Sequence, residues 1–457
     1  MSFQSLSFLV FLAAAVVLCR AAGRWSRLLG LGLLELACLA FYTASGGWRA
    51  LALLALGGGV SYLAARRPSR SALFAAAGYH IVVLLGCKLL GWMPLGISFF
   101  TFQQLWLLHE TASGAFRLTD RAAFPLYVFF FPTVTSGPIL KPQGFFGQLA
   151  GDRFLRPAAE DLAAGLYAVF YGTAKKVLLA DGFGTVVDNG WARLGSLSAV
   201  DAWLVILGYT LQLYFDFSGY CDIAAGCARL LGIRLPVNFN SPYRALSVGE
   251  FWKRWHMTLT SFLRECLYFP LGGSRKGTAR TCANIMLVFL VSGFWHGAGW
   301  TFLLWGGLHG AAQVLERLWG KRRERLPRLL RWCLTFAFVN VAWVFFRAGS
   351  VSSAVTLLKT AVIGPLASPP AWLFHGLLPS ETKALRLLLP DHQSLVDLGR
   401  GALLYAAGLT AALWPRNVIA QMDAFRPTRL GAAALGLVMA WCVLSFTGMT
   451  TFIYSNF

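Results

Sequence analysis

The most informative stretch of the chain, residues 236–280, reads PVNFNSPYRALSVGEFWKRWHMTLTSFLRECLYFPLGGSRKGTAR. Between residues 229 and 280 there are nine Lys or Arg residues and two Glu residues, interleaved with aromatic side chains. This density of charge is too polar for a helix that crosses lipid, and the aromatic content is not typical of a free loop. We therefore expect amphipathic or re-entrant helices at the cytoplasmic face of a membrane.

Two interpretations of this stretch remain open on the residues alone. It is either an interfacial belt of Trp and Arg, or a wall that receives an anionic ligand such as the phosphates of coenzyme A. Arg and Lys suit the second role because they form charge-assisted hydrogen bonds with phosphate oxygens.

The sequence on both sides of this stretch is strongly apolar. Of the 457 residues, 57% are hydrophobic and 13% are charged, whereas a soluble domain carries about 25% charged residues. Several apolar runs approach the ~20 residues that cross a bilayer. The composition predicts an all-α polytopic membrane protein and excludes a soluble enzyme, a collagen-like fibre and a disordered chain. The expected spans are residues 28–43, 49–65, 71–92, 123–139, 162–180, 200–217, 282–305, 330–346, 400–415 and 429–447.

The charge balance is basic, with 40 Lys and Arg against 19 Asp and Glu, a formal net charge of +21. Basic residues cluster at 20–27, 66–70 and 321–331, in short segments next to apolar runs. The positive-inside rule places such segments in the cytoplasm, so the charge does not require nucleic acid as a partner. The first apolar run, residues 3–19, has no basic residues before it, and we expect a retained helix, not a cleaved signal.

The organisation suggests one polytopic domain, residues 1–457, in three parts. Residues 1–92 are expected to be scaffold helices, 94–347 a motif-bearing catalytic core, and 348–457 a loop with closing helices. Within the middle part, Gly, Pro, Trp and Asn interrupt the apolar runs. Interrupted backbone at membrane depth is tolerated where it is buried in protein or lines a cavity, so we expect the functional site there.

Seven histidines offer candidate chemistry, and His296 is the strongest. It lies inside the 282–305 run, between glycines that allow another backbone or a substrate to approach closely. An imidazole there can exchange a proton near neutral pH. His309 has a similar setting, but on one unbroken helix it would face away from His296 unless the glycines bend the chain. His80 and His109 are expected to be structural.

Several other signatures carry less weight. His392 and Asp397 have the spacing of a glycerolipid-type acyltransferase motif, but two fixed positions arise easily by chance. No serine-hydrolase elbow, P-loop or metalloprotease motif is present. The nine cysteines form no C-x-x-C pair, so neither a metal site nor a redox dithiol is expected.

A set of distinctive motifs follows in order along the chain, at residues 96–103, 130–138, 214–224, 238–243, 250–256, 268–273, 294–297 and the ending 452–454. Together these motifs resemble the membrane-bound O-acyltransferase (MBOAT) family, in its bacterial alginate O-acetyltransferase membrane-subunit branch. The resemblance implies about eleven transmembrane helices plus re-entrant helices around a central tunnel, with His296 as the catalytic histidine and His256 as its second histidine.

The family mechanism implies a cytoplasmic thioester donor, either acetyl-CoA or a carrier-protein thioester, and no tightly bound cofactor. His296 would act as general base, and the acyl group would pass across a bacterial cytoplasmic (inner) membrane. An extracytoplasmic SGNH-type, esterase-like partner would then complete O-acetylation of a polysaccharide. Donor- or substrate-binding side chains are expected at Asn238, Arg254, Trp255, Arg264, Trp295 and His309.

Other functions remain alternatives. The acyl group could be D-alanyl, transferred to teichoic acid, or the acceptor could be peptidoglycan. A transporter or flippase for a glycan or a lipid-linked intermediate would also contain broken helices and a polar interior. A catalytically inactive scaffold is a third possibility, although both His256 and His296 are retained.

Overall fold

The computed structural model describes all residues except 2, 152, 378, 415, 447–452 and 454–457. All regular secondary structure in the described residues is helical, which confirms the all-α prediction. Among these described residues, six helical segments are long and apolar enough to cross a membrane, so the expected count of about eleven stays a prediction. These segments are Leu6–Trp25, Arg27–Arg66, Arg70–Leu89, Ala159–Ala192, Gly277–His296 and Arg328–Arg347.

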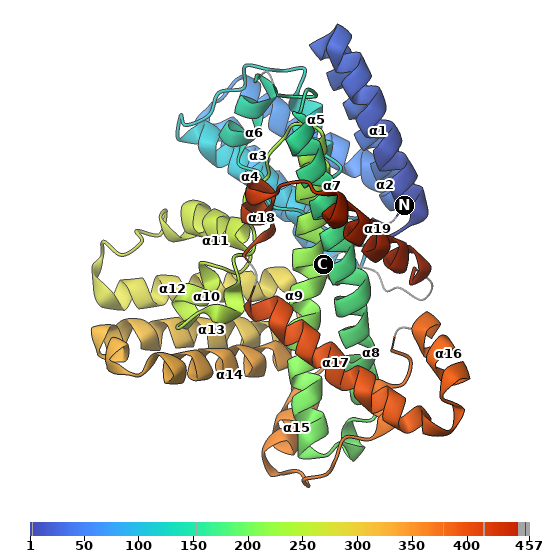
Figure 1. The fold of residues 1–457 in the computed structure, drawn as a ribbon. Coiled ribbons are helices and arrows are strands. Elements are labelled where there is room, and N and C mark those ends of the chain that lie inside the picture. Colours follow the sequence, from blue (N-terminus) through green and yellow to red (C-terminus); the bar gives the residue numbers. More distant parts are fainter. Residues whose placement is uncertain (2, 152, 378, 415, 447–452, 454–457) are drawn as a thin grey trace.

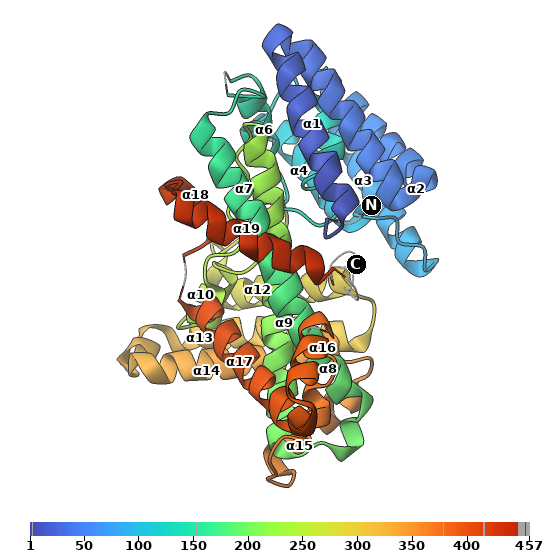
Figure 2. The same cartoon turned by 45° about the vertical axis from the view of Figure 1, so that its right-hand side comes forward.

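The N-terminal helices α1 (Leu6–Trp25), α2 (Arg27–Arg66) and α3 (Arg70–Leu89) pack together at one end of the molecule (Figures 1 and 2). The predicted spans 28–43 and 49–65 are the two halves of α2, which meet at Gly47. This residue has a φ of 79°, a conformation that glycine adopts without steric cost.

The predicted span 123–139 is wrong. Here α4 (Ile97–Ala112) is followed by α5, which covers only Phe124–Phe129, and then by an irregular segment before α6 (Pro142–Leu149). Residues 130–140 are all buried, and their prolines cannot donate backbone hydrogen bonds. The hydroxyl of Tyr220 donates to the Pro132 carbonyl at 3.0 Å, and the Thr258 hydroxyl accepts from the Ile139 N–H at 3.1 Å. Protein side chains thus replace the hydrogen bonds that a helix would have made.

Helix α9 (Ala199–Leu230) runs through the middle of the molecule, beside α7 (Ala159–Ala174) and α8 (Asp181–Ala192) (Figure 1). Two glycine pairs allow α7 and α9 to approach closely. A Cβ on Gly219 would lie 2.9 Å from the Gly172 carbonyl oxygen, and one on Gly226 would lie 2.6 Å from that of Gly165. Small residues at such crossings are typical of helix packing in membranes.

Buried ion pairs link α9 to a π-helical turn, Lys175–Ala180, that connects α7 to α8. The Lys175 ammonium lies 2.7 Å from Asp222, and the Lys176 ammonium lies 2.7 Å from Asp216 and 2.8 Å from Asp181. We did not expect these pairs within the 162–180 run. The feature of the sequence that could have indicated them is the two adjacent lysines in an apolar segment, where ionisable residues are rare and normally paired.

The predicted span 282–305 is also wrong as a single helix. The chain forms α12 (Gly277–His296), breaks at residues 297–299, and continues as α13 (Trp300–Trp319). With α14 (Arg328–Arg347), these helices form a layer beside α9 (Figures 1 and 2). Helices α12 and α13 pack closely against each other through glycines. A Cβ on Gly293 would lie 2.5 Å from the Phe302 carbonyl oxygen, and one on Gly306 would lie 2.4 Å from the Phe289 carbonyl oxygen.

Short helices occupy the polar stretch before this layer, as expected for residues 236–280. They are α10 (Val248–Trp252), α11 (Met257–Leu263) and a π-helical turn, Arg264–Tyr268. Short 3₁₀ segments lie at Leu194–Ser196, Pro242–Arg244, Gly320–Arg325, Ala371–Phe374 and Pro390–His392.

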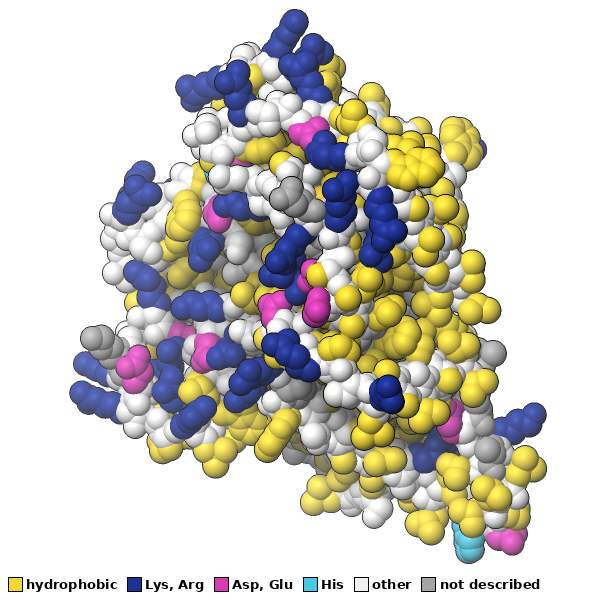
Figure 3. All heavy atoms as spheres, turned by 45° about the horizontal axis from the view of Figure 1, so that its top comes forward, with side chains coloured by type: hydrophobic (Ala, Val, Ile, Leu, Met, Phe, Trp, Pro, Cys, Tyr) yellow, Lys and Arg dark blue, Asp and Glu magenta, His cyan; other side chains and the backbone are white. Residues whose placement is uncertain are grey.

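The C-terminal part contains α15 (Val351–Ile363), α16 (Pro379–Leu388), α17 (Gln393–Leu413), α18 (Val418–Ala424) and α19 (Arg429–Leu444). Of the motif at 452–454, Phe452 and Tyr454 lie outside the described residues. The Ile453 N–H donates to Asp216 at 2.8 Å, so this point of the tail contacts the centre of the molecule. On the surface in Figure 3, Lys and Arg gather on one side, and the other side is a broad apolar area of the kind that lipid covers.

Candidate active site

His296 is the last residue of α12, and 3% of its surface is exposed. Its ring packs edge-on against Trp305 of α13, with ring centres 5.1 Å apart, and against Phe346 of α14 at 5.0 Å. The extended conformation of Gly297 (φ −177°) ends the helix directly after the histidine. His296 is thus held at a helix end, where three helices of the layer meet.

The break after His296 also explains the position of His309. Because α13 folds back along α12, Trp305 lies between the two histidines, with its ring centre 5.1 Å from each. His309 is fully buried, and its Nδ1 accepts a hydrogen bond from the Trp252 indole N–H at 3.2 Å. In the neutral ring the proton is therefore on Nε2.

His256 lies between α10 and α11 and is 1% exposed. Its Nδ1 is 3.2 Å from Oδ1 of Asn238, and the Phe217 ring packs against it with centres 4.8 Å apart. The Phe99 ring packs against both His256, with ring centres 6.1 Å apart, and Trp295, the neighbour of His296, at 5.6 Å. The two histidines that were expected to carry the chemistry, 40 residues apart in the sequence, therefore lie in one buried region.

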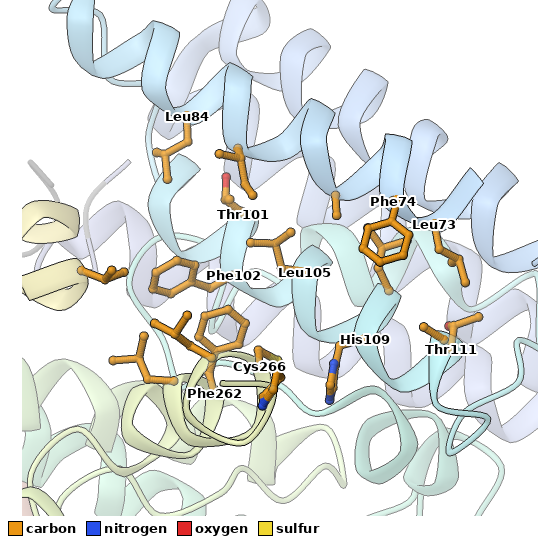
Figure 4. A pocket seen from close by; sticks show the side chains of 18 of the residues that line it. Leu73, Phe74, Leu84, Thr101, Phe102, Leu105, His109, Thr111, Phe262 and Cys266 are labelled. Atoms are coloured by element: carbon orange, nitrogen blue, oxygen red, sulfur yellow. The ribbon is translucent and has the colours of Figure 1, made fainter. Parts of the chain in front are cut away.

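Trp295 connects this region to a cavity of about 990 Å³. Its indole stacks on Phe102, and its carbonyl accepts a hydrogen bond from the Lys88 ammonium at 2.7 Å. Side chains of α3, α4 and the α11 region face the cavity, including His109 and Cys266 (Figure 4). The walls are largely apolar, so the cavity suits an acyl chain or a lipid tail better than a sugar.

Of the residues expected to bind the donor, Arg254 and Trp255 have structural partners. Arg254 forms an ion pair with Glu250 at 2.9 Å and also donates to the Asn240 carbonyl. Trp255 is 1% exposed and packs against Trp343 in the aromatic core. Their role in binding stays a prediction.

Arg264 is differently placed. Its side chain is exposed and lines a second cavity, of about 210 Å³, together with Trp252 and Ser292. Ser292 lies one turn before His296 on α12, and Trp252 hydrogen-bonds to His309. Among the predicted donor-binding residues, Arg264 therefore has an exposed side chain and lines a cavity close to His296 and His309.

Lys88 and Thr258 belong to the site but were not predicted from the sequence. Lys88 was visible as an ionisable residue in an apolar run, a setting that often indicates function. Thr258 gave no such signal, because its contacts to Asn238 and Ile139 depend on the folded chain. Across the parts of the chain that the structure describes, no group of three or more His, Cys, Asp or Glu residues could hold a metal ion.

The pairing of His392 with Asp397 has no support in the structure. Asp397 is buried, and its carboxylate lies 3.6 Å from Nδ1 of His375 and 3.6 Å from Arg400. His392 is exposed at the start of α17. The Asp397 carboxylate is therefore close to His375 and not to His392.

Comparison with known proteins places this geometry in a family. Residues 74–355, more than half of the chain, match the model of the MBOAT, membrane-bound O-acyltransferase family. The chain is 41% identical over 299 residues to a peptidoglycan O-acetyltransferase of Helicobacter pylori, covering 59% of this chain and 57% of that protein. It is 39% identical over 267 residues to a probable alginate O-acetylase of Pseudomonas aeruginosa, covering 57% and 50%.

A more distant relative is a teichoic acid D-alanyltransferase of Bacillus subtilis, 28% identical over 268 residues and covering 55% of this chain and 68% of that protein. The chain matches about half the length of the first two relatives. The matched family segment contains His256, His296 and His309, together with the helical layer that positions them. The chain is therefore a multi-pass membrane protein that belongs to the membrane-bound O-acyltransferase family.

Proposed function

We propose that the protein is an O-acyltransferase that takes an acetyl group from a cytoplasmic thioester and passes it across a bacterial inner membrane to an extracytoplasmic polysaccharide. The observation that carries this proposal is the pair of buried histidines, His256 and His296, in one region of the family-matched segment. The exposed Arg264 beside the smaller cavity supports an anionic donor, acetyl-CoA or a carrier-protein thioester.

In the proposed reaction His296 is the general base. The hydroxyl oxygen of the acceptor bonds to the acyl carbon while the carbon–sulfur bond breaks. The hydroxyl proton passes to His296 and from there to the departing sulfur, so that a free thiol and an ester result. A neutral imidazole performs both transfers because it can accept and then return one proton.

The relatives support acetyl as the group and a surface polymer as the acceptor. The two relatives at 41% and 39% identity are named for O-acetylation, whereas the D-alanyltransferase is 28% identical. Because the relative at 41% sequence identity is named as a peptidoglycan O-acetyltransferase, peptidoglycan is a second candidate acceptor, beside alginate and other exopolysaccharides. Completion of the transfer by an exported SGNH-type partner is part of the proposal.

The test is ester-linked acetate on the purified surface polymers of cells that carry wild-type protein, His296→Ala or His296→Gln at matched membrane levels. Both variants should lose the acetate while polymer amounts stay normal. His392→Gln, on an exposed histidine far along the chain, is the control and should keep wild-type acetate. Normal acetate in His296→Gln would favour the transporter, for which hydrogen bonding suffices, and normal acetate with lost envelope D-alanine would favour D-alanyl transfer.

A further inference from the structure

The side-chain amide of Asn238 has a defined orientation. Asn238 is 3% exposed, and its Oδ1 accepts hydrogen bonds from the Thr258 backbone N–H at 3.1 Å and the Thr258 hydroxyl at 2.9 Å. A backbone N–H can only donate, so the atom that faces it must be the amide oxygen. The amide nitrogen at the other end donates to the Cys221 sulfur at 3.3 Å. Because sulfur can accept a hydrogen bond, this contact is compatible with the orientation that the Thr258 N–H sets.

This orientation determines the tautomer of His256. The His256 Nδ1 lies 3.2 Å from the same amide oxygen, which can only accept. Nδ1 must therefore carry the proton, and in a neutral ring Nε2 is left with a lone pair. Burial lowers the pKa of His256 to about 3, so the ring is neutral at physiological pH.

The local backbone holds this arrangement in place. His256 has a φ of 44° and a ψ of 54°, a left-handed conformation that is unfavourable for a non-glycine residue and persists where the surroundings enforce it. The Met257 N–H donates to the Asn238 carbonyl at 2.9 Å, and the Asn240 N–H donates to the Arg254 carbonyl at 2.9 Å. The segments that carry Asn238 and His256 are therefore tied together by backbone as well as side-chain hydrogen bonds.

We propose that Asn238 is a positioning residue that fixes His256 in the Nδ1–H tautomer, so that Nε2 of His256 is a hydrogen-bond acceptor in the region of His296. The two histidines are then not equivalent. His256 can take up a hydrogen bond or a proton at Nε2 but cannot donate one from that atom. The catalytic meaning rests on the proposed acyl transfer, whereas the tautomer itself can be measured without any activity.

The direct test is solid-state NMR of the full-length protein in lipid membranes, with the histidine rings labelled with ¹⁵N. The signals that disappear in His256→Gln belong to His256. We expect a protonated Nδ1 and an unprotonated Nε2 in the wild type. Asn238→Leu removes the acceptor and should give a mixture or the Nε2–H form, whereas Asn238→Asp retains an oxygen and should keep Nδ1 protonated.

Cys221→Ala is the matched control, because it removes the partner of the amide nitrogen and leaves the oxygen in place. It should leave the His256 tautomer unchanged. A wild-type Nε2–H tautomer would overturn the proposal. So would an unchanged Nδ1–H signal in Asn238→Leu or, if that variant does not fold, loss of the Nδ1–H form in Asn238→Asp.

An activity measurement separates this proposal from the proposed function. With acetyl-CoA as the probe donor, Asn238→Leu should lower kcat roughly 100-fold, the scale of general acid–base assistance, with KM for the donor within about twofold. Asn238→Asp should recover part of the rate. If the wild type transfers no acyl group, the proposed function fails while the NMR result still decides the tautomer. A parallel rise of KM in both variants would instead indicate a donor-binding role for Asn238.

Discussion

The ion pair between Lys175 and Asp222 allows a quantitative test of the packing around α9. The side chains of both residues are more than nine-tenths buried, with Nζ and Oδ2 2.7 Å apart. The ammonium also lies 5.2 Å from the ring centre of Tyr171 and 5.4 Å from that of Tyr214. Lys175→Met would leave the Asp222 carboxylate buried without its partner cation.

The expected loss of stability follows from these contacts. Removing one partner of a buried pair costs about 3–5 kcal/mol, and the two cation–π contacts add about 1 kcal/mol. We expect Lys175→Met to lower the free energy of unfolding by about 4–6 kcal/mol. The double variant Lys175→Met/Asp222→Asn leaves no unpaired charge and should lose only about 1–2 kcal/mol.

The assay is reversible unfolding in mixed micelles by a denaturing detergent, followed by tryptophan fluorescence. Lys359→Met, on an exposed lysine of α15, is the matched control and should change the stability by less than about 0.5 kcal/mol. A double variant as unstable as Lys175→Met, or a Lys175→Met variant as stable as the control, would contradict a stabilising buried pair at this position.

Three further predictions concern the helical layer and the cavities. Gly306→Val should lower the stability by about 1–3 kcal/mol, and with it the yield of folded protein, because the new side chain would overpack against the Phe289 carbonyl. Gly307→Ala, whose Cβ would enter open space, should keep the wild-type yield. Equal yields of the two variants would contradict the close crossing of α12 and α13. Arg264→Gln should raise KM for the thioester donor roughly five- to tenfold at nearly constant kcat, measured against Lys359→Gln, and a selective loss of kcat would argue against donor binding at this residue. Burial, with the nearby Glu265 and Glu110 carboxylates, raises the pKa of the Cys266 thiol to about 12. In a variant that retains only this cysteine, alkylation by iodoacetamide should therefore rise about tenfold per pH unit from pH 8 to 11, and a plateau near pH 9 would contradict the shift.

The fold class and the region of the site could be predicted because they depend on composition and local pattern. Apolar runs predict membrane helices irrespective of their partners. The glycines around His296 indicated a close backbone approach, and the approach occurs between α12 and α13 at Gly293 and Gly306. The bend that His309 would need in order to lie on the same side as His296 is present, as a break at residues 297–299.

The errors arose where hydropathy was the only signal. Hydropathy counts residues 130–139 as part of a span, but the prolines at 132 and 138 prevent a regular helix there, and hydrogen bonds from distant side chains replace the helical ones. Likewise, the ion pair of Lys175 with Asp222 joins residues 47 positions apart, and no local pattern shows which acidic residue a buried lysine will meet. Pairings of this kind depend on tertiary structure.

The π-helical turn at Lys175–Ala180 has a consequence for tolerance to insertions and deletions. A π-helical turn holds one residue more per hydrogen-bonded ring than an α-helical turn. Deleting one residue from this segment would let α7 continue into α8 as a regular α-helix with nearly the same phase, because the π-helical turn accommodates one extra residue in the helix. Asp181, and Phe183, which stacks on Phe215 of α9, would then keep their faces of the helix. A single-residue deletion here would thus act locally, on the lysines of the turn, whereas the same deletion inside α7 or α8 would rotate everything after it by about 100°.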